Sequence, residues 1–135
     1  MPKKAKTKVI LDSNFLMLPF QFNIDIVAEI DRILGGGYEI SVPRGVLQEL
    51  HYMSFKAENL NDRKMAKMAI EFGGRFNIIE GEAEDADEAI ASLADEDTIV
   101  CTNDRALKSR LRRLGVPVMY LRQKNRLELE GYGVP

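Results

Sequence analysis

A short apolar run that ends at a polar or acidic residue occurs twice in this chain of 135 residues. Residues 8–11 (KVIL) precede Asp12, and residues 98–101 (TIVC) precede Thr102 and Asp104. Consecutive apolar residues, several of them β-branched, are typical of strands that are buried on both faces of a parallel sheet. Open α/β sheets bind their ligands at the carboxyl ends of such strands. The two runs therefore predict buried strands that bring carboxylates to one edge of a sheet.

Predicted strands and helices alternate along the rest of the chain, which indicates a parallel sheet covered by helices. We therefore predict an α/β fold of three layers, α/β/α, with a central parallel sheet of about five strands. Asn23 is expected to cap the first long helix, because polar side chains of this kind accept hydrogen bonds at helix starts. The expected strands are 8–11, 38–42, 76–79, 98–101 and 116–121, and the expected helices are 23–34, 43–53, 61–72, 83–94 and 105–114.

The length fits one domain, which we place at residues 1–121. Residues 122–135 lack periodicity and are expected to form a basic tail, packed on the domain or extending from it as an arm over the surface. No apolar run approaches the roughly 20 residues that cross a bilayer, and no signal peptide is recognisable. The single cysteine, Cys101, excludes an internal disulfide framework and reads as a core residue. We expect a cytoplasmic protein without a membrane partner.

Charge is strongly segregated although the net charge is only −2. Residues 80–97 contain nine acidic residues and no basic one, whereas residues 105–126 contain eight basic residues and no acidic one. A local basic block attracts polyanions regardless of the overall balance. The plainer alternative is that each block is a solvated helix face. If the basic block binds RNA, its candidate residues are Lys108, Arg110, Arg112, Arg113, Arg122 and Lys124.

Four acidic residues lie where the predicted fold can bring them together: Asp12, Glu49, Asp87 and Asp104. Each also has a structural explanation, since the three aspartates could cap helices or occupy their first turns, and Glu49 could be a surface residue. Grouped carboxylates repel one another unless a cation holds them. Oxygen ligands without cysteine or clustered histidine favour Mg²⁺ or Mn²⁺, one ion or two. Such ions activate water for phosphodiester cleavage, so the pattern indicates a metal-dependent nuclease.

The same four residues, in order and context, resemble the PIN-domain ribonucleases. Asp12 follows the first strand, Glu49 lies in VPRGVLQEL, Asp87 opens DEAIASLA and Asp104 ends TND. The resemblance implies a parallel-sheet α/β/α domain whose acidic pocket binds Mg²⁺ or Mn²⁺ and cleaves single-stranded RNA. It also implies that Asn14 and Thr102 are secondary members of the pocket, with Asp85 as a companion of Asp87 or a substitute for it. A homodimer is common in the family.

The C-terminal third of the sequence resembles one group of nucleases within this family. The segment NDRALKSRLRRLGVPVMYL and the ending GYGVP look like PIN nucleases that process small-subunit ribosomal RNA, and their archaeal relatives, more than like VapC toxins. The leading hypothesis is a metal-dependent endoribonuclease whose substrate is single-stranded RNA, with precursor ribosomal RNA as one candidate. The alternatives are an RNA- or pre-ribosome-binding module with weak or no catalysis, and a VapC-like toxin restrained by an antitoxin.

Overall fold

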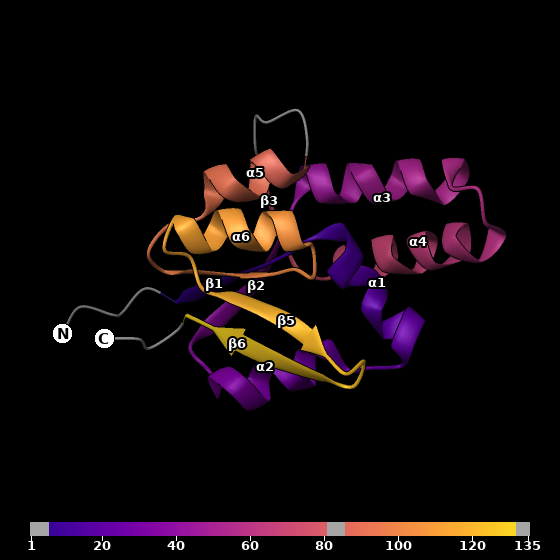
Figure 1. Cartoon of the computed structure of the whole chain (residues 1–135). Helices are drawn as coiled ribbons and strands as arrows, with labels where there is room; N and C mark the ends of the chain where they lie inside the picture. The colour runs from indigo at the N-terminus through magenta and orange to yellow at the C-terminus, as the bar shows by residue number, and fades with distance from the viewer. Residues whose placement is uncertain (1–5, 81–85, 132–135) are drawn as a thin grey trace.

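Six strands and six helices form the described part of the chain, residues 6–80 and 86–131 of a computed structural model (Figure 1). The strands build one sheet in the order β3-β2-β1-β4-β5-β6, in which β6 alone is antiparallel to its neighbour. This confirms the predicted α/β fold, with six strands in place of about five. The elements are β1 (Thr7–Leu11), α1 (Ser13–Phe22), α2 (Ile26–Leu34), β2 (Tyr38–Pro43), α3 (Arg44–Lys56), α4 (Leu60–Gly73), β3 (Asn77–Ile79), α5 (Ala86–Leu93), β4 (Thr98–Cys101), α6 (Arg105–Arg113), β5 (Val118–Arg122) and β6 (Arg126–Glu130).

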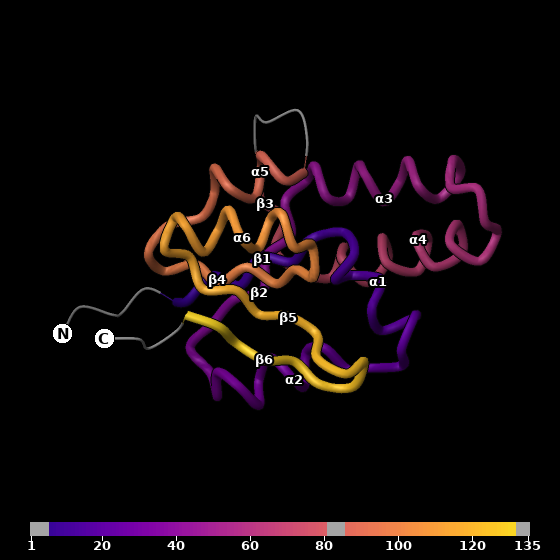
Figure 2. Tube along the Cα trace, viewed as in Figure 1, coloured from indigo at the N-terminus to yellow at the C-terminus, as the bar shows by residue number. Residues whose placement is uncertain are grey.

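The strand order reverses direction at the centre of the sheet. The chain leads from β1 outward to β2 and β3, then crosses back to β4 and continues to β5 and β6 (Figure 2). Helices α5 and α6 cover one face, α2 lies on the opposite face, and α3 and α4 pack together beyond the end of the sheet (Figure 1). The carboxyl ends of the neighbouring strands β1 and β4 therefore form a topological switch point, where sheets of this kind bind their ligands.

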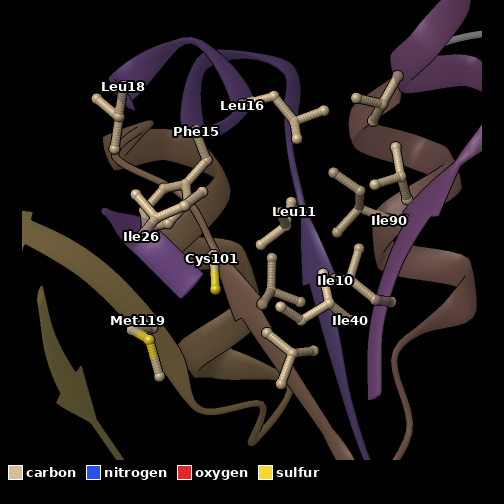
Figure 3. Packing of buried hydrophobic residues seen from close by; sticks show 14 of the residues in the cluster. Ile10, Leu11, Phe15, Leu16, Leu18, Ile26, Ile40, Ile90, Cys101 and Met119 are labelled. Carbon is tan, nitrogen blue, oxygen red and sulfur yellow. The ribbon is translucent and has the colours of Figure 1, made fainter. Parts of the chain in front are cut away.

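The core is built around β1, which has apolar neighbours on both sides. Figure 3 shows Phe15 and Ile26 gathered with Cys101 on one side of the strand, and Ile90 of α5 on the other. Cys101 is fully buried, as its position in a buried strand predicts. Because alternate residues of β1 face opposite layers, its three-residue apolar run fills both halves of the core. Packing of β1 in the core thereby fixes the position of Asp12, the residue that follows the strand.

The first connection differs from the predicted one at Asn23. This residue ends α1 in a left-handed conformation, with φ of 54°, and does not begin the next helix. Asparagine tolerates that conformation better than most residues do. The N-cap of α2 is Asp25, whose carboxylate accepts a hydrogen bond from the Ala28 amide at 3.0 Å. The prediction of the cap was wrong by two residues, because both side chains have the chemistry of a cap.

Of the two alternatives for residues 122–135, the arm over the surface is wrong for residues 122–131, and residues 132–135 lie outside the described part of the chain. Residues 126–130 form β6, which pairs along its whole length with β5. A three-residue turn, 123–125, joins the strands, and Gln123 and Lys124 in it have the positive φ that is common in tight hairpins. Alternation of leucine with charged residues in RLELE is the period of a half-buried strand. Leu127 is accordingly buried, at 1% exposure.

Two further points concern the expected elements. Helix α5 is described from Ala86 onward, so the predicted helix start at 83 and the candidate Asp85 lie outside the described residues. None of the helices in the described ranges has both the length and the apolar composition that crossing a bilayer requires.

Candidate active site

A polar pocket of about 350 Å³ opens at the carboxyl ends of β1 and β4. It contains all four carboxylates that the sequence singled out, and they come from four different parts of the fold. Asn14, predicted as a secondary member, also lies in its wall. The described residues that line the pocket are Asp12, Ser13, Asn14, Glu49, Ala86, Asp87, Glu88, Asp104 and Arg110.

Strand register brings Asp12 beside Thr102. Leu11 and Cys101 are paired across β1 and β4, so the residues that follow them leave the sheet at the same level. The Asp12 carboxylate accepts two hydrogen bonds, from the Phe15 amide to Oδ1 at 2.8 Å and from the Thr102 hydroxyl to Oδ2. Asp12 is buried and caps α1. The expected secondary role of Thr102 thus takes the form of a contact with a carboxylate of the pocket.

Asp104 is connected to the same threonine. Its backbone amide donates to Thr102 Oγ1 at 3.1 Å, and its own Oδ1 accepts from the Leu107 amide at 2.9 Å, which caps α6. The structural explanation of Asp12 and Asp104 as helix caps is therefore correct, and both residues nonetheless line the pocket. A carboxylate oxygen has two lone pairs, so an oxygen that caps a helix can accept a second partner.

Glu49 and Asp87 enter the pocket from the helices. Glu49 lies on an exposed part of α3, where its Oε1 accepts a hydrogen bond of 2.9 Å from the Ser13 hydroxyl. Asp87 lies in the first turn of α5. Sequence reasoning missed Ser13, although its position directly after Asp12 at a helix start was the available signal. The hydrogen bond orients the carboxylate of α3 toward the end of β1.

The electrostatics of the pocket are unfavourable for Asp12 in its ionised form. Burial raises the pKa of Asp12 to about 7, even though hydrogen bonds from Thr102 and Phe15 favour the charged state. The negative charges of Asp87 and Glu49 raise the pKa further. A cation placed among these groups would lower the pKa of Asp12, because it stabilises neighbouring carboxylates as anions. It would thereby offset both the burial and the charge repulsion.

The donor set fits a hard divalent cation in its chemistry. Oxygen donors from five acidic residues, the four above and Glu88, line the described wall of the pocket, with no histidine or cysteine among them. Within residues 6–80 and 86–131, no three acidic, histidine or cysteine side chains stand at the spacing of a complete ligand set. Mg²⁺ tolerates this, since it is usually held by one or two carboxylates and keeps several waters.

One of the six candidate RNA-binding residues reaches the pocket. Arg110 lines it and forms an ion pair of 2.6 Å with Glu88, a pocket residue that the sequence did not single out. Lys108 pairs with Glu130 at 2.8 Å and lies 3.9 Å from the centre of the Tyr120 ring. Of the remaining four, Arg112 donates to the Val116 carbonyl, Arg122 pairs with Glu128, Lys124 lies above the Phe22 ring, and Arg113 is exposed.

A second hollow, of about 330 Å³, lies between α1, α2 and α4. Its wall is mainly apolar, with Phe20, Ile26 and Phe72 among its residues, and its two carboxylates, Asp25 and Glu71, compare with five in the polar pocket. The polar pocket is therefore the candidate active site.

Comparison with known proteins identifies the family and supports the fold. The family model described as "PIN like domain" matches residues 9–124. Ribonuclease VapC4 of Methanocaldococcus jannaschii is 33% identical over 127 residues, which cover 92% of this chain and 97% of that protein. Ribonuclease VapC9 of Archaeoglobus fulgidus is 25% identical over 121 residues, covering 90% and 87%. Among solved structures, that of the PIN domain endonuclease Utp24 has a TM-score of 0.72 at 23% identity, covering 91% of this chain and 90% of that one; it supports the fold.

Proposed function

The chain belongs to the PIN-like domain family, and on that premise we propose that it is an endoribonuclease that hydrolyses single-stranded RNA with a bound divalent metal ion. One observation carries the proposal: Asp12, Glu49, Asp87 and Asp104 line a single pocket at the topological switch point of the sheet. The two relatives described above are named ribonucleases, which supports RNA as the substrate. The ion would be Mg²⁺ or Mn²⁺, given the all-oxygen donors.

The residues of the chain have distinct parts in this reaction. When bound, the ion supplies an activated water and neutralises charge on the phosphodiester. Thr102 and Ser13 hold Asp12 and Glu49 in position through their hydroxyl groups. Asp104 is fixed by the turn that begins α6. Partners that orient ligand side chains in this way typically contribute about 10–100-fold to metal affinity or activity.

Removal of one carboxylate is expected to weaken metal binding strongly. We expect Glu49→Gln to weaken Mn²⁺ binding by at least about 10–100-fold, since the loss of a ligand costs no less than the loss of an orienting partner. Titration calorimetry at fixed pH measures the affinity directly, without RNA. Glu49 is exposed, so the fold should tolerate the change.

The matched control is Glu96→Gln, which removes an exposed glutamate just before β4, at the amino end of the strands and away from the pocket. Its Mn²⁺ affinity should equal that of the wild type. Equal affinity in Glu49→Gln would remove Glu49 from the metal site. Absence of binding in the wild type at millimolar metal would favour the RNA-binding module without catalysis.

Arg110 is proposed to contact a phosphate of the substrate. Of the described residues that line the pocket, it is the one basic side chain, and Glu88 holds it there at 2.6 Å. Arg110→Gln should raise KM for RNA by about tenfold, the equivalent of one charge-assisted contact, and change kcat little. Arg110→Lys should recover only part of the loss, because lysine lacks the planar fork.

Steady-state cleavage of a labelled single-stranded RNA separates the two kinetic constants. Arg75→Gln, at an exposed position between α4 and β3, serves as the control for loss of a positive charge. An effect on kcat without an effect on KM would contradict a role in substrate binding.

A VapC-like toxin is a second candidate function, favoured by the names of the two relatives. The C-terminal third of the sequence favours a nuclease of small-subunit ribosomal RNA. The two differ in partner: a toxin binds a small antitoxin. Co-expression with the product of an adjacent gene distinguishes them, since a stable complex that suppresses cleavage supports the toxin. Cleavage of precursor ribosomal RNA with no such complex supports the processing nuclease.

A further inference from the structure

Helix α3 carries a line of residues that begins at α5, passes through the pocket and continues beyond it. Gly45, Glu49, Tyr52 and Lys56 are spaced i, i+4, i+7 and i+11, so they share one side of the helix. A Cβ atom at Gly45 would lie 3.9 Å from the Ala86 Cα, which places α5 against the start of the line. Glu49 lines the pocket, and Tyr52 and Lys56 are exposed. We call these four residues the α3 stripe.

Tyr52 and Lys56, the residues of the stripe beyond the pocket, are of the types that bind single-stranded nucleic acid. Tyr52 is 60% exposed, although it is a large aromatic residue. Its ring lies 6.0 Å from that of Phe55, which in turn lies 5.4 Å from the ring of His51. These edge-to-face contacts support the Tyr52 ring from one side. Exposed aromatic rings beside cationic side chains are how single-stranded nucleic acids are bound without sequence preference.

The dimensions of the stripe suit a strand that leaves the pocket. With a rise of about 1.5 Å per residue, Tyr52 lies about 4.5 Å and Lys56 about 10.5 Å beyond Glu49 along the helix axis. One strand of duplex DNA advances about 3.4 Å per nucleotide, so the step from Glu49 to Tyr52 is of the size of one to two stacked nucleotides. Figure 1 shows α3 running from α5 past the end of the sheet, with α4 beside it.

We propose that the α3 stripe binds single-stranded RNA next to the cleavage site, with Tyr52 stacked on a base and Lys56 in contact with a phosphate. The inference rests on the proposed ribonuclease function and adds the path of the substrate. A second copy of the chain is a less suitable partner for this surface. The stripe contains the charged residues Lys56 and Glu49, which a dimer interface would have to bury. The exposed apolar residues Leu60 and Met68 belong to α4, the other helix of the pair, whereas Phe55 of α3 is 55% exposed and lies beside Tyr52.

Binding is measured in a background that does not cleave, Asp12→Asn, with a labelled single-stranded RNA of about 12 nucleotides, within the usual range of site sizes. Fluorescence anisotropy in the presence of Mg²⁺ gives Kd. Tyr52→Ala should weaken binding by about 5- to 150-fold, the range for loss of one stacked base. Tyr52→Phe and Tyr52→Trp should retain affinity, whereas Tyr52→Leu, which is apolar but has no ring, should not. Leu60→Ala is the control, since Leu60 is 61% exposed and lies off the stripe.

The charge of Lys56 is tested through salt dependence. Lys56→Gln should reduce the slope of log affinity against log salt by about one, as expected for one phosphate contact. Lys64→Gln, an exposed lysine on α4, should leave the slope unchanged. An unchanged slope in Lys56→Gln would overturn the assignment of that residue.

The outcomes separate this inference from the function on which it rests. Equal Kd values for Tyr52→Ala and Leu60→Ala, in a protein that cleaves RNA, would overturn the α3 stripe alone. A wild type that neither cleaves nor binds RNA would overturn the proposed function and the stripe together. Dissociation of a dimer by Tyr52→Ala in light scattering, with unchanged RNA affinity, would identify the surface as a subunit interface and also overturn the proposal.

Discussion

Asp12→Asn is expected to abolish RNA cleavage and, in the absence of metal, to make the protein more stable at pH 8. The loss of activity should be at least about 100-fold, because the change removes a proposed metal ligand whose orienting partners alone contribute about 10–100-fold. The gain in stability follows from the burial of a carboxylate whose pKa is raised to about 7. Function and stability therefore make opposite demands on this residue.

The sign of the pH dependence follows from the two states of the chain. In the unfolded chain Asp12 titrates near its ordinary pKa of about 3.9. The folded protein holds the proton up to about pH 7, so the folded state binds more protons between these values. The contribution of Asp12 to the free energy of unfolding therefore falls as the pH rises from about 4 to about 7. Asparagine does not ionise and avoids this loss.

Urea unfolding in EDTA measures the effect. At about pH 8 we expect Asp12→Asn to exceed the wild type by about 1–3 kcal/mol, given about 1.4 kcal/mol per pKa unit and the altered hydrogen bond to Thr102. Near pH 4 the difference should shrink. Asp25→Asn is the matched control, because Asp25 also caps a helix but is exposed. A pH-independent difference between wild type and Asp12→Asn would contradict the buried charge.

Metal provides a second check on the same pair of proteins. Mg²⁺ at about 100 times its Kd should stabilise the wild type by about 2.7 kcal/mol, since it binds the folded state. Asp12→Asn should gain little from the same addition. An equal gain in both proteins would place the ion at another site.

The sequence predicted the centre of the fold and the proposed ligands because both depend on local patterns. The runs before Asp12 and Thr102 have the composition of strands buried on both faces, and the structure confirms both strands. Parallel strands end at a common edge, so carboxylates that follow them were expected to meet. In the sequence, Glu49 and Asp87 stand at the borders of the apolar stripes of their helices, where a carboxylate can lean over the edge of the sheet without entering the core. All four line the pocket.

The features that sequence reasoning missed depend on contacts between distant segments. Ser13 and Glu49 are 36 positions apart, and only the packing of α1 against α3 brings the hydroxyl to the carboxylate. The pairing of Arg110 with Glu88 likewise requires α5 and α6 to lie side by side. Asn23 and Asp25 have interchangeable cap chemistry, so only the backbone decides between them. The arm expectation failed for a different reason, since the alternation in RLELE was present but was outweighed by the many charges around it.

The sixth strand leads to the second large expected effect. Leu127→Ala should lower the free energy of unfolding by about 2–5 kcal/mol, the usual cost of truncating a buried leucine. Leu127 is 1% exposed, and α2 holds its backbone: Glu29 accepts from its amide at 2.9 Å, and Arg32 donates to its carbonyl at 3.0 Å. These contacts cover the open side of an edge strand, which would otherwise offer unpaired backbone groups. The strand is thus part of the core.

Leu114→Ala is the matched control for Leu127→Ala, because the same atoms are removed from a leucine that is 59% exposed at the end of α6. We expect a change within about 0.5 kcal/mol there, as for most surface substitutions. Urea unfolding of the two variants measures the difference. Similar small effects in both would mean that the side chain of Leu127 contributes little to the core. A large effect confined to Leu127 would mean that the domain needs β6 to be stable, because a loss of this size is a large fraction of the 5–15 kcal/mol that typically stabilises a domain.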